Sequence, residues 1–395
     1  MQKKVIALAV AGLVSGAAFA QSNVTIYGVA DLGFVTSSGT RSGANGAKAN
    51  TGSANYNGID SGIWGGSRIG FKGEEGLGNG LKAIFTLEYY IAPDENGGVG
   101  AAPQTTGAGG SGSVSRQSFV GLSSAKLGTL TLGRQYSAGY YTQVRNDAFG
   151  GNAAGALGAA NGAALNTFVA GTRGRLDNAV VYTSPNWSGF TVVGGYSYGE
   201  NGTSQSEGIS QSAGGVFTAG LNYANGPLNL DIGYQQRQNV SAGILTAATA
   251  AQTGQITSVG SAAGDNVNEW MVGGSYDFKV VKLFATYQDQ DDNNGTSATE
   301  ASNRVWSLGA TMPVFGNGKI HASYADVSWD RRGAGSSDIW ALGYSHALSK
   351  RTTLYTSYTY ADNDRTALVA AGAVGNTKFL GESNSTITAG INHSF

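Results

Sequence analysis

The sequence predicts an all-β protein, a 16-stranded antiparallel transmembrane β-barrel, and three observations support this prediction. The chain begins with an export leader, its strands alternate apolar and polar residues, and long and short connections alternate along it. In the last ten residues, Ile387, Ala389 and Ile391 stand at every second position, and the chain ends on Phe395. A final strand with one apolar face on an exported chain is typical of an outer-membrane barrel.

The first twenty residues have the three parts of a secretory signal peptide. Two lysines form the basic segment, an apolar run covers residues 5–13, and a small-x-small cleavage site ends at Ala20. We expect cleavage between Ala20 and Gln21. The chain then consists of a signal peptide, residues 1–20, and one barrel domain, residues 21–395.

The composition excludes several classes of protein. The 24 basic and 25 acidic residues give a net charge of −1, which is too balanced for nucleic-acid binding. The chain has no cysteine, so it has neither a disulfide framework nor a thiolate metal site. After the leader, no apolar run approaches the roughly 20 residues of a membrane-spanning helix. The mean hydropathy of −0.14 fits a barrel, because only alternate residues of its strands face lipid.

Four stretches alternate with period two over their whole length: 217–223, 228–235, 270–276 and 306–312. In the second of them, Leu228, Leu230 and Ile232 share one face, and small polar residues share the other. The polar faces carry few charges, as the wall of a water-filled lumen allows.

The connections between the predicted strands fall into two classes. Seven are short: 74–80, 123–127, 185–189, 224–227, 277–280, 314–317 and 346–351. Eight are long, at roughly 35–62, 92–112, 137–174, 200–213, 238–265, 291–301, 329–334 and 362–383. They alternate strictly, which gives sixteen strands with long outer loops and short periplasmic turns. A secreted β-solenoid or sandwich is the alternative, but a solenoid would show a fixed repeat period, and none is present.

The barrel must also close. Unpaired backbone groups cost several kcal/mol each in hydrocarbon, so a spanning sheet has no free edge. We therefore expect the first strand, residues 24–34, to pair with the last, residues 385–395. Aromatic residues near strand ends fit two interfacial girdles: Tyr89, Tyr90, Trp187, Tyr196, Tyr198, Trp270, Tyr276, Trp340, Tyr344, Tyr358 and Tyr360.

Six short segments, in this order along the chain, resemble a known family. They are NVTIYGVAD (23–31), SRIGFKGEEGLGNGLKA (67–83), GTLTLGRQ (128–135), NAVVYTSP (178–185), LSKRT (348–352) and GINHSF (390–395). With them the chain resembles the trimeric general porins of Gram-negative outer membranes, in the neisserial and β-proteobacterial branch. The resemblance implies a homotrimer and a third outer loop folded into the lumen as a constriction.

The third predicted loop, 137–174, has the composition that such a position needs. It is the longest of the eight, and residues 150–164 are nearly all Gly, Ala and Asn. Long loops of this kind are usually functional or disordered, so a mobile outer loop is the alternative. The loop has no proline, and Asp147 is the only acid between Gln135 and Leu176.

Alternation places several cations in the lumen, since Arg or Lys facing the lipid midplane costs about 2–4 kcal/mol. Arg68 opposes Ile69, and Lys82 opposes the apolar positions of its own strand. Arg116 is opposite in phase to Phe119.

Arg175 opposes Val180 and Tyr182 in phase, so the same alternation turns it inward. By resemblance, Arg68, Arg116 and Arg175 match an arginine ladder that crosses the wall opposite loop three. Lys82 and Asp147 are expected to complete a transverse field.

These features predict a passive, water-filled channel for small hydrophilic solutes and ions, with mild, anion-leaning selectivity. Acids in the outer loops could reduce or reverse that preference. A substrate-specific porin for sugars or organic acids, and a surface adhesin on the same barrel, are the alternatives. An autotransporter is disfavoured, because no passenger domain precedes the barrel.

An enzyme is not expected. His321, His346 and His393 lack the spacing of metal ligands, and no serine is singled out as the nucleophile of an outer-membrane lipase. We expect no cofactor and no metal. The expected partners are two further copies of the chain, outer-membrane lipid and lipopolysaccharide, small solutes and ions, and the outer-membrane assembly machinery, for which Phe395 is part of the signal by resemblance.

Overall fold

The computed structural model describes residues 23–40, 53–95, 99–100, 115–164, 166–169, 174–198, 215–238, 266–292, 302–330, 335–364 and 383–395. The predicted signal peptide and its cleavage site between Ala20 and Gln21 lie outside the described residues.

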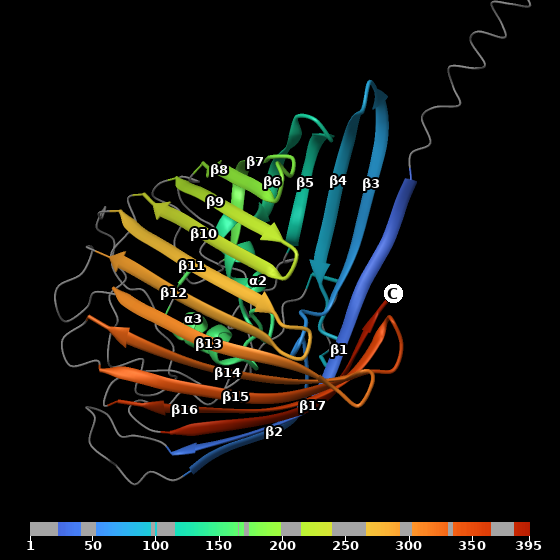
Figure 1. Ribbon diagram of the computed structural model, residues 1–395. Coiled ribbons are helices and arrows are strands. Elements are labelled where there is room, and N and C mark those ends of the chain that lie inside the picture. The colour runs from blue at the N-terminus through green and yellow to red at the C-terminus, as the bar shows by residue number, and fades with distance from the viewer. Residues whose placement is uncertain are drawn as a thin grey trace, which may run out of the picture.

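The described residues form one curved antiparallel sheet with two short helices inside it (Figure 1). The elements of the first half are β1 (Asn23–Thr40), β2 (Ser53–Ser61), β3 (Arg68–Gly78), β4 (Leu81–Tyr90), β5 (Ser115–Ser124), β6 (Gly128–Tyr136), α2 (Ala138–Arg145), α3 (Ala156–Ala163), β7 (Arg175–Thr183) and β8 (Phe190–Ser197). The second half contributes β9 (Val216–Asn225), β10 (Leu228–Arg237), β11 (Val267–Asp277), β12 (Lys282–Asp292), β13 (Asn303–Val314), β14 (Gly318–Trp329), β15 (Ser336–Ala347), β16 (Thr352–Asn363) and β17 (Asn384–Ser394).

The seventeen strand segments in the described residues make a barrel of sixteen strands, because β2 and β3 share one place in it. β2 pairs with β1 from Leu32 to Thr40, and β3 pairs with the same strand from Asn23 to Val29. The two segments are therefore one spanning strand that is interrupted between Ser61 and Arg68. The predicted count of sixteen is confirmed.

The barrel closes between the first and the last strand, as predicted. β1 and β17 are antiparallel, with Val29 opposite Ser394 and Gly39 opposite Asn384. At the end of the chain, Phe395 and Gly28 exchange two backbone hydrogen bonds of 3.1 Å. Every spanning strand thus has a partner on both sides, which an apolar membrane requires of the backbone.

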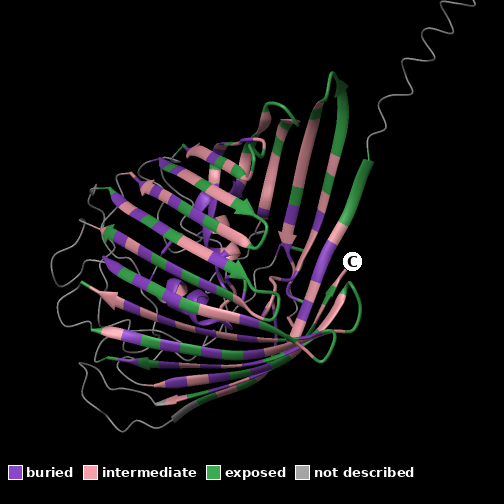
Figure 2. Cartoon of the chain, viewed as in Figure 1, coloured by how far each residue is buried: buried purple, intermediate pink, exposed green. Residues whose placement is uncertain are grey.

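The alternation along the strands separates a lipid-facing surface from a lumenal one. Buried and exposed bands alternate along β10 to β16 in Figure 2. Outward-facing Trp270, Trp306 and Trp340 are 38%, 39% and 42% exposed, whereas inward-facing Met271 is fully buried. Large apolar side chains outside the barrel are the expected surface for contact with lipid.

The structure corrects two boundaries predicted from the sequence. The connection at 35–62 is mostly strand, since β1 extends to Thr40 and β2 begins at Ser53. The turn predicted at 74–80 shortens to Asn79 and Gly80, whose φ values of 50° and 76° are those of a two-residue hairpin turn. Gly and Asn adopt positive φ readily, so these two residues determine where the hairpin reverses.

The two helices interrupt the connection between β6 and β7. Ser137 is the N-cap of α2, and its hydroxyl accepts a hydrogen bond from the Tyr140 backbone N–H (3.2 Å). α2 and α3 have eight residues each. The part of the chain that the structure describes contains no helix long and apolar enough to span a membrane.

The contact between Gly28 and Phe395 gives a test of barrel closure. A Cβ at residue 28 would stand 2.3 Å from Phe395 Cζ and 2.5 Å from the Arg68 carbonyl oxygen. We expect Gly28→Ala to destabilise the barrel by about 1–3 kcal/mol, the usual effect of overpacking. The measurement is the temperature at which the folded band converts to the unfolded band on a denaturing gel.

Gly194→Ala is the matched control, because a Cβ there meets nothing within 4 Å. Equal conversion temperatures for the two variants would contradict the close contact between Phe395 and β1.

Candidate functional site

The described residues of the segment 137–174, here called loop 3, lie inside the barrel and follow the inner wall (Figure 1). α2 packs against β9, β10 and β11, and α3 packs against β13, β14 and β15. The core formed by α3 is almost free of exposed surface: Leu157, Phe168 and Met271 each have 0% exposure. Loop 3 is therefore packed against the wall as predicted, and the alternative of a mobile outer loop is wrong for the described residues.

Glycines in the wall make room for this loop. At five inward positions on β9, β10, β11, β13 and β15, an added Cβ would come within 2.7–2.9 Å of a loop 3 atom. The pairs are Gly220 with Ala138, Gly233 with Phe168, Gly273 with Asn146, Gly309 with Ala148, and Gly343 with Phe149. The small residues of the alternating strands thus form a groove into which loop 3 fits.

A buried carboxylate on β11 holds the return segment of loop 3. Glu269 is 1% exposed and accepts hydrogen bonds from the backbone N–H groups of Thr167 (3.0 Å) and Phe168 (3.2 Å). The Thr167 hydroxyl and the Gln288 amide also donate to it. Bonds to a charged acceptor are roughly twice as strong as neutral ones, so Glu269 is a principal attachment point.

Further wall side chains hold the first half of the loop. Asp231 on β10 accepts from Arg145 (2.9 Å) and from the Asn146 amide (2.8 Å) at the end of α2. His321 on β14 donates through Nδ1 to the Ala148 carbonyl oxygen (2.9 Å). These bonds fix the side of the lumen that loop 3 occupies.

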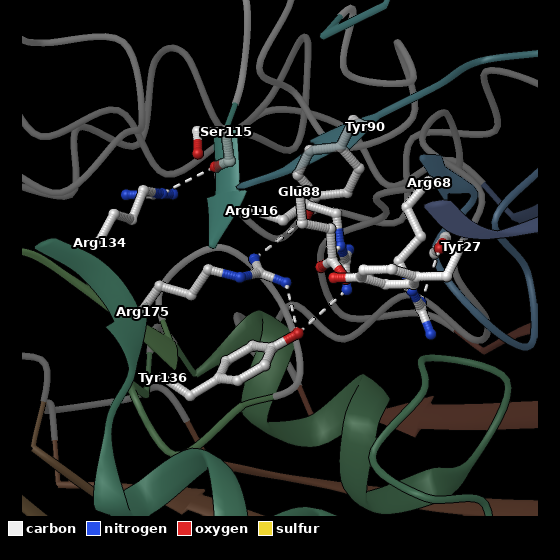
Figure 3. A network of polar contacts seen from close by, with 10 residues as sticks. Tyr27, Arg68, Glu88, Tyr90, Ser115, Arg116, Arg134, Tyr136 and Arg175 are labelled. Atoms are coloured by element: carbon white, nitrogen blue, oxygen red, sulfur yellow. Dashed lines mark hydrogen bonds and ion pairs between the residues drawn. The ribbon is translucent and has the colours of Figure 1, made fainter. Parts of the chain in front are cut away.

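The wall formed by β3 to β7 carries a compact set of polar and aromatic side chains, here called the arginine group (Figure 3). It consists of Arg68, Glu88, Tyr90, Arg116, Tyr136 and Arg175, which come from β3, β4, β5, β6 and β7. Three of the five residues predicted for the constriction, Arg68, Arg116 and Arg175, therefore lie together.

Arg116 reaches the lumen through a β-bulge. In the pairing of β4 with β5, Glu88 is opposite Gln117 and Tyr89 is opposite Ser115, so Arg116 has no partner in the ladder. Such an extra residue bends the strand and turns a side chain to the other face. The prediction that Arg116 faces the lumen was right, but its reason was wrong. Phe119, against which the phase of Arg116 was counted, lies opposite Thr86 and faces the lumen itself.

Arg116 is 5% exposed, and its guanidinium forms an ion pair with Glu88 (Nε to Oε1, 2.7 Å). It also donates to the Tyr136 hydroxyl (3.2 Å) and lies over the Tyr90 ring, 4.7 Å from its centre. A buried charge is costly unless it is paired and hydrogen-bonded, and these contacts provide both.

Arg175 is fully buried, and within the described residues its guanidinium is held by tyrosines. It donates to the hydroxyls of Tyr90 (3.1 Å) and Tyr136 (3.3 Å) and lies 4.9 Å from the Tyr136 ring centre. Cation–π contacts contribute about 2 kcal/mol when they are desolvated, which offsets part of the cost of burial.

Arg68 is the most accessible of the three, with 28% of its side chain exposed. Its Nε lies 3.5 Å from Glu88 Oε2, and its Nη1 donates to the Gly66 carbonyl oxygen (2.9 Å). Glu88 therefore serves two arginines and also accepts from the Tyr27 hydroxyl (3.0 Å).

The other two predicted residues lie elsewhere. Lys82 stands at the start of β4, six residues from Glu88, which is about 20 Å along a strand. It faces inward but pairs with Glu74 (2.7 Å) near the turn between β3 and β4. Arg134 on β6 pairs with Asp177 outside the arginine group.

Asp147 lies in loop 3 between the helices and is 6% exposed. Its Oδ2 accepts backbone hydrogen bonds from Phe149 (3.2 Å) and Gly151 (2.7 Å). Burial raises the pKa of this carboxyl to about 6, although the backbone N–H groups oppose the shift. The carboxylate thus shapes a turn of the loop.

Sequence reasoning missed Glu88, Tyr90 and Tyr136. Glu88 is in phase with Lys82, so the alternation already turned it inward. Tyr90 was assigned to the aromatic girdle, but it is 7% exposed and lies between two arginines in the lumen. Its position one residue after Tyr89 was the available signal, since neighbouring strand residues face opposite ways.

A closed antiparallel barrel with an apolar outer face and a polar lumen is the architecture of an outer-membrane channel. The chain matches the family model described as "Gram-negative porin" over residues 7–366. The protein therefore belongs to the Gram-negative porin family, lies in the outer membrane and is a diffusion channel.

Curated relatives and a solved structure agree with this assignment. The chain is 32% identical over 401 residues to outer membrane porin protein 32 of Delftia acidovorans, with 100% of both chains covered. It is 30% identical over 399 residues to an outer membrane porin of Bordetella pertussis, with 92% and 95% covered. The solved structure of an anion-selective porin from Comamonas acidovorans is similar with a TM-score of 0.70 and 28% identity, covering 95% of this chain and 100% of that one.

The raised pKa of Asp147 predicts a pH dependence of stability. The folded state binds the Asp147 proton more tightly than the unfolded state, whose pKa is near 3.8. The contribution is therefore fully present below about pH 4 and is lost as the pH rises through about 6. We expect Asp147→Asn to remove this part of the pH dependence, which corresponds to about 3 kcal/mol at most.

The measurement is the unfolding temperature of wild type and Asp147→Asn between about pH 4 and 7. The difference between the two proteins isolates Asp147 from the other carboxylates. Parallel curves for the two proteins would contradict a titration of Asp147 in this range.

Proposed function

We propose that the protein is a passive, water-filled channel for small hydrophilic solutes and ions whose constriction favours anions. The observation that carries this proposal is the charge balance of the arginine group. Arg68, Arg116 and Arg175 place three guanidinium groups beside a single carboxylate, Glu88. Charged side chains that line a narrow pore determine the sign of the ions that pass.

Loop 3 forms the other side of the proposed constriction. It packs against β9 to β16 and thereby narrows the lumen. Solutes then pass between this loop and the wall formed by β3 to β7. Asp147 uses its carboxylate within the loop, and Lys82 lies nearer the periplasmic mouth. We therefore assign the selectivity to the three arginines, with Lys82 as a secondary basic position and Asp147 as a residue that shapes the loop.

The similar structure from Comamonas acidovorans is that of an anion-selective porin, which supports the same sign of selectivity. An organic-acid porin is the second candidate, because Arg116 and Arg175 pack on tyrosine rings beside the solute path. A current that saturates with an organic anion, but not with chloride, would favour that candidate.

The outer surface supports assembly into a homotrimer. Tyr358 and Tyr360 face outward on β16. The residues in register with them on β17, β1 and β2 are smaller and mostly polar. These residues are Ile387, Ser385, Thr36, Ser38, Asn57 and Asn55. Polar side chains on an outward face are costly against lipid, so we infer that this face contacts the neighbouring copies. The aromatic residues on the rest of the outer surface contact membrane lipid and lipopolysaccharide.

The charge of the constriction is tested by recording single channels under a salt gradient in planar bilayers. Arg68→Glu changes the arginine group from three cations and one anion to two cations and two anions. We expect the ratio of anion to cation permeability to fall by about twofold or more, because the wall charge determines selectivity. Low salt is used, since the Debye length shrinks to about 8 Å at physiological ionic strength. Conductance steps in groups of three would support the trimer.

Arg304→Glu is the matched control, because Arg304 is half exposed on the outer face beside Asp330. An unchanged reversal potential for Arg68→Glu would remove Arg68 from the constriction. Wild-type protein that is folded but gives no conductance steps would contradict the open channel itself and favour an adhesin.

Phe395 is proposed as part of the signal read by the outer-membrane assembly machinery. Its exposed ring at the end of the closing strand supports this role. We expect deletion of Phe395 to lower the yield in the outer membrane and to raise periplasmic aggregate, whereas Phe395→Trp keeps the aromatic ring and restores assembly. Fractionation with a heat-modifiability gel measures both. Normal assembly of the deletion would contradict the role.

A further inference from the structure

The six residues from Gly62 to Ser67, here called the inner segment, interrupt the spanning strand formed by β2 and β3. They leave the wall opposite Ala30 and Asp31, where the pairing partner of β1 changes from β3 to β2. A strand that is interrupted within a membrane barrel forfeits ladder hydrogen bonds, which the structure must replace. The Ser67 hydroxyl bonds the backbone N–H and carbonyl oxygen of Asp31 (3.0 Å each), and one side chain on β1 replaces most of the rest.

Asp31 supplies the missing acceptors. Its carboxylate is 0% exposed and accepts backbone hydrogen bonds from Ile63 (3.1 Å), Trp64 (3.2 Å) and Gly65 (3.0 Å). The side chains of Tyr355 and Asn392 donate to it at 2.7 Å each. A buried carboxylate with five donors is a rigid, preorganised support, which indicates that the inner segment has a defined conformation.

On one side the inner segment contacts loop 3. The Trp64 ring stacks on Tyr355 (5.1 Å between centres) and meets the edges of His321 (5.0 Å) and Phe149 (5.8 Å). The amide of Asn152 donates to the Trp64 carbonyl oxygen (3.4 Å). Trp64 is partly exposed, so its remaining surface faces the lumen.

On the other side the inner segment contacts the arginine group. The Gly66 carbonyl oxygen accepts from Arg68, and a Cβ at Gly66 would stand 2.7 Å from Arg116 Nη1 and 3.7 Å from the Tyr90 ring. The same six residues thus touch loop 3 at Trp64 and the arginines at Gly66.

We propose that the inner segment is a third member of the constriction, which joins loop 3 to the arginine group and completes the ring around the pore. Trp64 is a specificity-determining residue that limits solute size, and Asp31 is the positioning residue that holds it. This inference rests on the proposed channel function and deepens it, because it separates the limit on size from the selection by charge.

The test is single-channel conductance of Trp64→Ala in planar bilayers. Removal of the indole widens the ring without changing its charge. We expect conductance to rise roughly 1.5-fold, because pore diameter governs passage, with the sign of the reversal potential unchanged. Trp340→Ala is the matched control, since Trp340 lies on the outer face at 42% exposure and its loss leaves the pore as it is.

A second variant keeps the test decisive if the tryptophan is needed for folding. The chain has no cysteine, so Trp64→Cys introduces the only thiol. We expect a positively charged methanethiosulfonate reagent, added to open channels, to modify residue 64 and to lower the conductance in steps. Trp340→Cys, which faces lipid, should show no such step.

The outcomes separate the inference from the function on which it rests. Channels of unchanged conductance in Trp64→Ala, together with no effect of the reagent on Trp64→Cys, would overturn the role of the inner segment and leave the channel intact. An absence of conductance in the folded wild-type protein would overturn the channel function itself.

Discussion

Closure of the sheet between β1 and β17 is the constraint on which the rest of the structure depends. In hydrocarbon, every backbone N–H and C=O group needs a partner within the protein, and only a closed barrel gives each strand two neighbours. β1 meets this requirement on one side with β17 and on the other with two successive segments, β2 and β3. Because this second partner is divided into two segments, the chain between β2 and β3 leaves the wall and turns inward.

Loop 3 and the inner segment narrow the lumen, and the residues of the wall accommodate both. Glycines remove side chains where loop 3 passes, and buried carboxylates bind the backbone of the in-folded segments. Glu269 does this for loop 3 and Asp31 for the inner segment. Both use charged acceptors for several N–H groups, because irregular backbone away from solvent leaves donors that no ladder satisfies. The same solution in two places couples the shape of the pore to the rigidity of the barrel.

The arginine group combines charge with burial. Replacement of such buried charges by apolar residues is often neutral or stabilising, so stability alone does not explain their presence in the wall. Glu88 neutralises part of the charge, and the tyrosines hold the guanidinium groups without cancelling it. In the proposed channel, the result is a fixed positive field beside the path of the solute. Removal of Glu88 would therefore strengthen the field but leave Arg116 without its buried partner.

The sequence by itself determined the class of fold, the number of strands, their closure and the lumenal orientation of Arg68 and Lys82. These follow from local patterns, since a period of two assigns each side chain to a face and the alternation of turns and loops counts the strands. The expectation for the leader likewise follows from local composition, whereas the expectation for Phe395 comes from the resemblance to the porin family.

The tertiary structure decided which of these residues meet. Arg116 turns inward through a bulge whose position depends on the register of β4 and β5, which no local pattern specifies. Arg175 binds Tyr90 from 85 positions away in the chain, and Asp31 receives Tyr355 from 324 positions away. Such partners are brought together by barrel closure, so their identity depends on the completed sheet and not on the segments that contain them.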